Sequence, residues 1–315
     1  MKKVLFSILM LVYVSMSNAQ ESQTSYNFLR LPISAHAAAL GGDNVTLIED
    51  DEALIFHNPA LLYTVEDKTI LLNYMNYMSG VNTASAAFNK IIKEKASVAA
   101  SVQYINYGKM KEMTADNVQV GDFTAKDIAI CGYFSYLLTE RLTGGITAKF
   151  ITSYIADYHS IAMGVDLGLN YYDPEKDLSL GLVVKNLGGQ LKAFNDDYER
   201  MPIDLQAGVT KRLTHTPFRF TATLVDLGHW NYKFIKHINI GADILLSPQI
   251  WVGGGYNFRR GNEITVLSAD GNESAHGAGL TLGGGINLDR FKLNVAYGKY
   301  HVSSSSVLVN VAFKL

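Results

Sequence analysis

The chain has 315 residues and a formal net charge of −2 at pH 7, so its charge does not favour a nucleic-acid partner. Only 18% of the residues are charged, whereas Tyr (18) and Gly (27) are abundant, which is an unusual composition for a soluble protein. The single cysteine, Cys131, excludes an intrachain disulfide. Its AICGY context carries no metal-ligand or nucleophile signature, so we expect a small buried or lipid-facing side chain there.

Residues 1–19 are typical of a secretory signal peptide. Two lysines precede the apolar stretch 4–14, which is too short for a membrane-spanning helix. The small residues of 17–19 suit cleavage before Gln20, and no cysteine follows, which argues against a lipoprotein. The mature chain is therefore expected to be exported, either as a soluble protein or into an outer membrane.

The segment 20–67 differs from everything after it. Its Ala-rich part predicts a two-turn helix that begins after Ser34 as N-cap and stops at a Gly pair. An acidic pair suits the start of a second short helix, because carboxylates favour the positive end of the helix dipole. Pro59 directs the residue before it out of helical geometry.

We expect 20–67 to fold as a plug, or hatch, inside a barrel, where polar backbone is shielded from lipid. The residues that define this motif are Leu31, Pro32, Gly41, Gly42, Asp50, Asp51, Asn58 and Pro59.

From residue 68 to residue 315 the pattern changes to strict alternation. In the last strand Val307, Val309 and Val311 fall on one face, with Leu308 and Asn310 on the other. About fourteen strands are predicted, at 68–79, 82–92, 95–107, 124–138, 141–155, 158–172, 176–186, 203–213, 216–228, 233–245, 248–260, 277–288, 290–300 and 303–314. Most are long enough to cross a bilayer at a tilt, which takes about 9 to 11 residues. The fold class is therefore all-β, a transmembrane antiparallel up-and-down barrel.

The connections support an outer-membrane location. Alternate joints are tight turns, whereas the joints between them include all the long ones, 108–123, 187–202 and 261–276. Short turns on one side and long loops on the other are the outer-membrane arrangement, with the short turns periplasmic. The even strand number also places both ends of the barrel on the periplasmic side.

No constellation in the sequence makes a persuasive catalytic, metal or cofactor site. Asp50, Asp51 and His57 are close in sequence, but helix capping and a hatch-to-wall hydrogen bond are commoner explanations. Two Ser-His-Asp sets can be drawn, Ser160 with His159 and Asp157, and Ser274 with His276 and Asp270, but neither has an oxyanion motif. The Gly triplets 253–255 and 283–285 precede no helix with a lysine, so they are not phosphate loops. They are expected to leave space for the hatch.

Three motifs carry a resemblance to a known family. The stretch FLRLPISAHAAALGG, with the later acidic pair and HNPALL, resembles the N-terminal signature of the PorV/PorQ family of type IX secretion outer-membrane proteins, distant relatives of FadL-type barrels. His36 stands where that signature usually has Arg. The stretches 181–191 and 201–227 resemble later strands of the family and are most similar to its PorQ-type members.

The resemblance implies an outer-membrane protein of Bacteroidetes that performs no chemistry. It would hold a PorZ-like partner at the cell surface, together with PorU and PorV, in the complex that processes and attaches secreted cargo. The long outward loops would then be the contact surface. The candidate contact residues are Met110, Met113, Phe194, Tyr198, Ile264 and Val266.

The alternative function is a FadL-like channel for uptake of hydrophobic small molecules, with the hatch as its gate. Uptake requires an apolar pocket in the lumen and a lateral opening in the wall. The inward faces of 161–171 and 278–287 carry Gly, Ala, Asn and Thr, unlike a lipid pocket, whereas 68–79 and 124–138 are apolar on both faces. The sequence therefore leaves both functions open.

Overall fold

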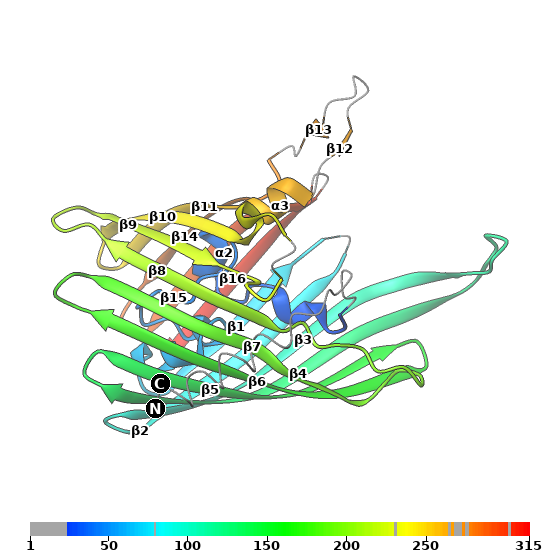
Figure 1. Cartoon of the computed structure of the whole chain (residues 1–315), viewed down its shortest axis with the longest axis horizontal. Coiled ribbons are helices and arrows are strands. Elements are labelled where there is room, and N and C mark those ends of the chain that lie inside the picture. Colours follow the sequence, from blue (N-terminus) through cyan, green and yellow to red (C-terminus); the bar gives the residue numbers. More distant parts are fainter. Residues whose placement is uncertain are drawn as a thin grey trace, which may run out of the picture.

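The structure is a closed antiparallel β-barrel of fourteen strands, which confirms the predicted fold class. This computed structural model describes residues 24–78, 80–229, 232–263, 266–267, 273–274, 277–301 and 304–315. The predicted signal peptide and Ile264 lie outside the described residues. Each strand pairs with its neighbours in the chain, and β1 closes the ring against β16 (Figure 1).

The wall strands are β1 (Thr69–Asn76), β2 (Asn82–Lys93), β3 (Ala96–Met113), β4 (Gln119–Thr139), β5 (Leu142–Ile155), β6 (Tyr158–Asp173), β7 (Leu178–Lys192), β8 (Asp204–Arg212), β9 (Phe218–Leu224), β10 (Ile238–Ser247), β11 (Ile250–Asn257), β14 (Leu280–Asn287), β15 (Phe291–His301) and β16 (Ser304–Lys314). A separate two-stranded sheet, β12 (Val266–Leu267) with β13 (Glu273–Ser274), lies between β11 and β14 in the chain. The helices are η1 (Asn27–Arg30), α2 (Ala35–Ala39), η2 (Glu52–Phe56), η3 (Pro59–Thr64), η4 (Phe234–His237) and α3 (Phe258–Glu263). Among the described residues, none of these helices has the length and apolarity to cross a membrane.

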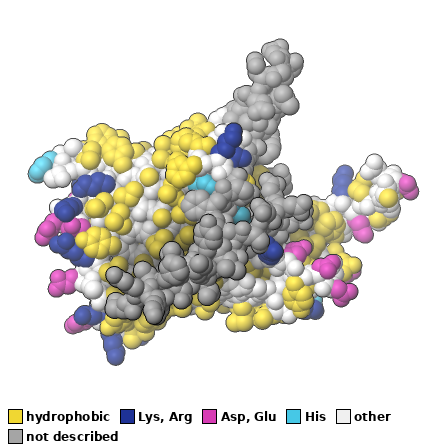
Figure 2. All heavy atoms as spheres, viewed as in Figure 1, with side chains coloured by type: hydrophobic (Ala, Val, Ile, Leu, Met, Phe, Trp, Pro, Cys, Tyr) yellow, Lys and Arg dark blue, Asp and Glu magenta, His cyan; other side chains and the backbone are white. Residues whose placement is uncertain are grey.

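The alternation along each strand separates a lipid face from an inner face. In β16, Val307 and Phe313 are exposed, whereas Leu308, Asn310 and Ala312 are buried. Figure 2 shows apolar side chains over the outer surface of the strands, with acidic and basic side chains gathered toward the ends of the barrel. An exposed apolar band of this kind needs lipid around it, so the chain is a barrel of the outer membrane.

The connections sort by length between the two ends as predicted, but the long connection 225–237 lies where strands 216–228 and 233–245 with a short joint were predicted, so those strand bounds are wrong. Turns of a few residues join β2 to β3, β4 to β5 and β10 to β11, at the end where Thr69 pairs with Lys314. The long connections, from β7 to β8, β9 to β10 and β11 to β14, lie at the opposite end. By the outer-membrane arrangement the long-connection end faces outward.

Two predicted loops are wrong in their bounds. Most of 108–123 continues β3 and β4 as a hairpin, in which Met110 pairs with Phe123 and Lys111 with Asp122. The first part of 187–202 belongs to β7, which extends to Lys192. Both stretches are rich in polar residues and Gly, as loops are, but two strands that pair with each other satisfy their backbone without an apolar face.

The predicted N-caps Ser34 and Asp51 are confirmed, but α2 has only five residues, shorter than the predicted two turns, and η1 and η3 were not predicted. The Ser34 hydroxyl accepts a hydrogen bond from the Ala37 amide at 3.2 Å. After α2 the backbone turns through Gly41 and Gly42, whose φ values of 107° and 108° favour glycine. Asp51 caps η2 through the Ala53 amide at 3.0 Å.

Candidate functional site

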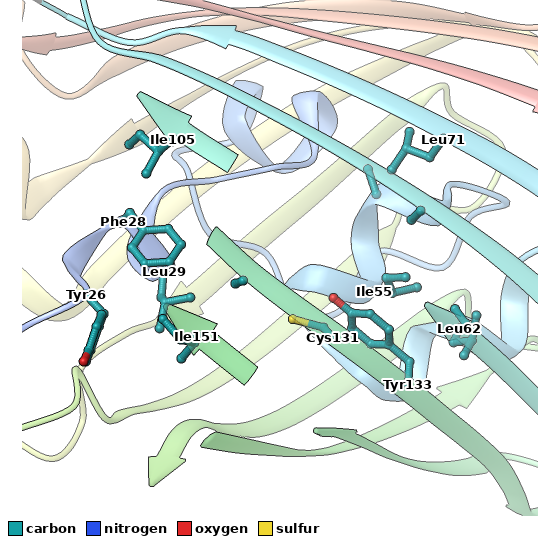
Figure 3. Close-up of a cluster of buried hydrophobic side chains, with 14 of the residues drawn as sticks. Tyr26, Phe28, Leu29, Ile55, Leu62, Leu71, Ile105, Cys131, Tyr133 and Ile151 are labelled. Atoms are coloured by element: carbon teal, nitrogen blue, oxygen red, sulfur yellow. The ribbon is translucent and has the colours of Figure 1, made fainter. Parts of the chain in front are cut away.

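The N-terminal segment (residues 24–67) packs against the inward face of the wall. Its apolar side chains Tyr26, Phe28, Leu29, Ile55 and Leu62 meet Leu71, Ile105, Cys131, Tyr133 and Ile151 of the strands (Figure 3). Cys131 is thus a small buried side chain, as expected. The wall also offers polar contacts, because Asn310 donates to the Ile33 carbonyl at 2.9 Å and Asn58 donates to the Leu169 carbonyl at 3.3 Å.

Glycines in the wall make room for this segment. A Cβ at Gly255 would overlap the backbone of Leu40, and one at Gly241 would lie 2.7 Å from the Leu40 Cβ. On the other side of the barrel a Cβ at Gly145 would overlap the Pro59 backbone. The space that the Gly triplets were predicted to leave is therefore occupied by the N-terminal segment.

A buried ionic cluster ties the segment to the wall. His36 is 0% exposed; its Nδ1 lies 2.7 Å from Glu49 and its Nε2 2.7 Å from Asp243 of β10. Arg219 of β9 binds both carboxylates, each at 2.6 Å. The His36 ring stacks on Trp251, with centroids 3.5 Å apart and planes within 3°.

Electrostatics keep this cluster charged. Burial opposes the charge on His36, but Glu49 and Asp243 outweigh it and raise the pKa of His36 above its ordinary 6.5. Burial likewise opposes ionisation of Glu49, but Arg219 and His36 hold the pKa of Glu49 well below its usual range. Arg219 and, in its protonated form, His36 therefore face two carboxylates inside the barrel.

The acidic stretch of the motif does not form a catalytic or metal site. Asp50 binds Lys292 of β15, and Asp51 accepts a hydrogen bond from the Ser34 hydroxyl at 3.3 Å. His57 lies 3.9 Å from Asp43, and burial together with the charge of Lys185 lowers the pKa of His57 to about 3. No group of three or more His, Cys, Asp or Glu side chains suited to a metal occurs in the described part of the chain.

Glu52 is the exception in this stretch. Its side chain is 0% exposed, and neither carboxylate oxygen has a hydrogen-bond partner. Burial, together with the neighbouring Asp51, raises the pKa of Glu52 to about 8. Glu52 is therefore protonated at neutral pH.

A cavity of about 190 Å³, which we call the mouth cavity, opens toward the outward end. Its charged lining is Arg30, Asp43, Lys185, Asp204, Asp226, Arg259 and Arg260, and Leu29 and Val225 are its apolar part. Asp226 forms ion pairs with Arg259 at 2.7 Å, with His229 at 2.5 Å and with Arg30 at 3.5 Å. Although burial opposes its ionisation, these cations hold the pKa of Asp226 below its ordinary value.

The wall is irregular between β6 and β7. Val165 pairs with Leu187 and Leu167 with Val184, so two residues of β7 face one of β6 in a bulge. Asn186 in the bulge has a φ of 59°, and its amide donates to Asp166 at 2.7 Å. Lys149 of β5 binds Asp166 at 2.8 Å and Asn186 at 2.7 Å. Buried polar contacts thus hold the wall in a distorted form.

An apolar groove of about 490 Å³, which we call the wall groove, lies at this bulge. Its lining includes Ile130, Phe150, Met163, Leu187, Gly188, Gly189, Leu191 and Lys149. A smaller cavity of about 20 Å³ inside the barrel is lined by Lys149 and Asp166 and also by Leu29. Leu29 in turn lines the mouth cavity. Lys149 therefore lines both the wall groove and the inner cavity, and Leu29 lines both the inner cavity and the mouth cavity.

The predicted site residues fall into three groups. Pro32, Gly41, Gly42, Asn58 and Pro59 are buried; Leu31 and Asp50 are half-buried. Of the proposed contact residues, Met113 and Tyr198 are exposed, and Met110 and Phe194 are half-buried. Val266 is in β12, and Ile264 lies outside the described residues. No pattern in the sequence signals Arg219, Asp243 or the mouth cavity.

The Ser-His-Asp sets do not form triads in the described residues. Ser160 is buried and bonds the Tyr26 hydroxyl, whereas His159 contacts Lys192 at 2.7 Å. The second set, at 270–276, has no described side chain.

Comparison with known proteins supports the fold. No protein-family model and no curated protein matches the sequence. Among solved structures, the Pseudomonas putida toluene transporter TodX aligns with a TM-score of 0.57 at 14% identity, over 92% of this chain and 97% of its own. The monoaromatic hydrocarbon channel CymD aligns at 0.60 and 11% identity, over 90% and 97%. A Pseudomonas aeruginosa FadL homologue aligns at 0.57 and 8% identity, over 90% and 98%.

The architecture that this chain shares with these structures defines its fold class. The chain has the FadL-type outer-membrane barrel fold, and TodX and CymD are transport proteins rather than enzymes.

Proposed function

We propose that this protein is an outer-membrane channel that takes up small hydrophobic or amphipathic molecules, releasing them through its wall, with the N-terminal segment as the hatch. One observation carries the proposal. Residues of the β6–β7 bulge line the wall groove; Lys149 lines both that groove and the small inner cavity, and Leu29 lines both the inner cavity and the mouth cavity.

The rest of the interior supports passage through the wall. The N-terminal segment fills the barrel axis, with Leu40, Leu47, Leu54 and Leu61 essentially buried. A straight path to the periplasmic end would have to displace this core and the His36 cluster. A path through the bulge would leave this core in place and would pass Leu29 and Lys149.

The experiment fills the wall groove. A Cβ at Gly189 meets no described atom within 4 Å, so Gly189→Trp is chosen to add bulk at the groove from a position with open space at its first side-chain atom. Gly132→Trp is the matched control, since Gly132 also has open space and lies outside the groove lining. Cells that carry the chain in their outer membrane should take up radiolabelled toluene faster than cells without it. Gly189→Trp should remove that gain and Gly132→Trp should keep it. Equal uptake with and without the chain would refute the proposal.

A second candidate function is the surface anchor implied by the PorV/PorQ resemblance, with a PorZ-like partner alongside PorU and PorV. The observation in its favour is the β3–β4 hairpin, which projects beyond the barrel (Figure 1). Past Asn106 and before Ala125 the two strands pair only with each other. Met113, Val118 and Val120 are exposed there.

Pull-down of the intact protein from membranes tests the anchor. A surface protein should co-purify with the full chain and be lost when residues 110–122 are replaced by a short turn. Retention of the same partner by the shortened chain would exclude the hairpin as the contact.

A further inference from the structure

The mouth cavity contains cationic groups that the protein itself does not neutralise. Lys185 is 6% exposed, lines the cavity, and makes no hydrogen bond or ion pair with any described residue. Its cross-strand neighbour is Asp204, whose carboxylate instead accepts from the Asp226 amide at 2.6 Å and from Gln206 at 2.7 Å. A buried ammonium without a partner is costly, so an anion bound beside Lys185 would be favoured.

Arg260 supplies a second unsatisfied donor. Its Nη1 is buried and has no hydrogen-bond partner among the described residues, and its guanidinium lies 4.0 Å from the centroid of the Tyr300 ring. A Cβ at Gly42 would lie 2.9 Å from that Nη1, so the absence of a side chain at Gly42 leaves room for the guanidinium. Stacking and backbone together fix the direction of this donor.

The sum of the charged side chains that line the mouth cavity indicates the charge of the ligand. Arg30 and Arg259 are both engaged by Asp226. Asp43 and Asp204 also face the cavity, which leaves an excess of one positive charge among its seven charged side chains. That balance favours a monoanion over a dianion such as phosphate.

The size and the apolar lining of the mouth cavity indicate what the uncharged part of the ligand can be. The cavity of about 190 Å³ is larger than the roughly 150 Å³ that holds a benzene ring in an engineered protein cavity. Leu29 and Val225 provide apolar contact. We propose that the mouth cavity binds a small monocarboxylate, with its carboxylate between Lys185 and Arg260 and its apolar body against Leu29 and Val225. This names the substrate class of the proposed channel and rests on that function only for what happens after binding.

The test is calorimetric titration of the full chain in detergent micelles. Benzoate should bind, whereas benzamide, its neutral isostere, and inorganic phosphate should bind at least about tenfold more weakly, because each loses a charged hydrogen bond or adds an uncompensated charge. Lys185→Gln should weaken benzoate binding by about tenfold or more. Lys109→Gln, which removes a charge from the exposed hairpin, should not change it.

The outcomes separate this inference from the channel proposal. Benzoate and benzamide binding equally, or Lys185→Gln binding benzoate as well as the unmodified chain, would overturn the inference. Should Lys185→Gln fail to fold, the comparison of benzoate with benzamide on the unmodified chain still decides. Selective benzoate binding without uptake of either radiolabelled toluene or radiolabelled benzoate would uphold the carboxylate site and refute the channel.

Discussion

Replacing the orphan carboxyl Glu52 by glutamine should stabilise the protein, and the gain should depend on pH. Glu52 has no partner for either oxygen and is fully buried, so only its protonated form fits the folded barrel. In the unfolded chain its pKa returns to the ordinary 4.5, against about 8 in the fold. Between these values folding must take up a proton, and stability falls as pH rises.

The magnitude follows from that linkage. Each pH unit between 4.5 and 8 costs about 1.4 kcal/mol, so Glu52 destabilises the fold by about 3 kcal/mol at pH 7. A glutamine side chain has a similar shape and never ionises. Glu52→Gln should therefore be nearly neutral at pH 4.5, gain about 3 kcal/mol at pH 7, and gain no more above pH 8.

Trp251 offers the signal for the assay, because it is buried against His36 in the interior. In a Trp230→Phe background, urea unfolding in micelles can be followed by the fluorescence of this single Trp at pH 4.5, 7 and 8.5. Glu112→Gln, on the exposed hairpin, is the control and should show no such pH-dependent gain. A gain for Glu52→Gln that is the same at all three pH values would show that ionisation of this carboxyl is not the cause.

Three further predictions concern the contacts between the N-terminal segment and the wall. Arg219→Met should cost about 3–5 kcal/mol, because it leaves a buried carboxylate uncompensated, as denaturant midpoints would report. Protonated His36, which faces Asp243, Glu49 and Arg219, should stabilise the fold fully below its unfolded pKa of 6.5, and this stabilisation should be lost as pH rises through the higher pKa of the folded state. The loss should appear as a red shift of Trp251 fluorescence at alkaline pH, because Trp251 stacks on the His36 ring. The red shift should be absent in His36→Lys. Gly255→Val should displace the α2 region and make it protease-sensitive, whereas the same substitution at the lipid-facing Gly132 should leave it protected.

The sequence was sufficient for the barrel because the media on the two faces impose a two-residue period that is visible in most of the strands. It was also sufficient for the helix caps, since Ser34 and Asp51 act on amides two or three residues away. Wall glycines such as Gly255 could be interpreted because a missing side chain inside a strand signals a close neighbour.

What the sequence missed is long-range or locally ambiguous. His36 and Asp243 are 207 positions apart, and nothing local distinguishes Asp243 from any other inward polar residue. The sequence at the β7 bulge predicts the end of a strand, because Lys185 and Asn186 followed by two glycines resemble a loop. In the structure a buried lysine from a different strand, Lys149, holds that stretch in the wall.

The bond between Ile33 and Asn310 has a consequence for biogenesis. It joins groups 277 positions apart, one in the N-terminal segment and one in the last strand. The N-terminal segment therefore cannot form all its native contacts until β16 is in place, so closure of the barrel and packing of this segment occur together late in folding. Whatever machinery inserts this protein has to keep an unsealed, water-filled sheet from aggregating for the whole of that interval.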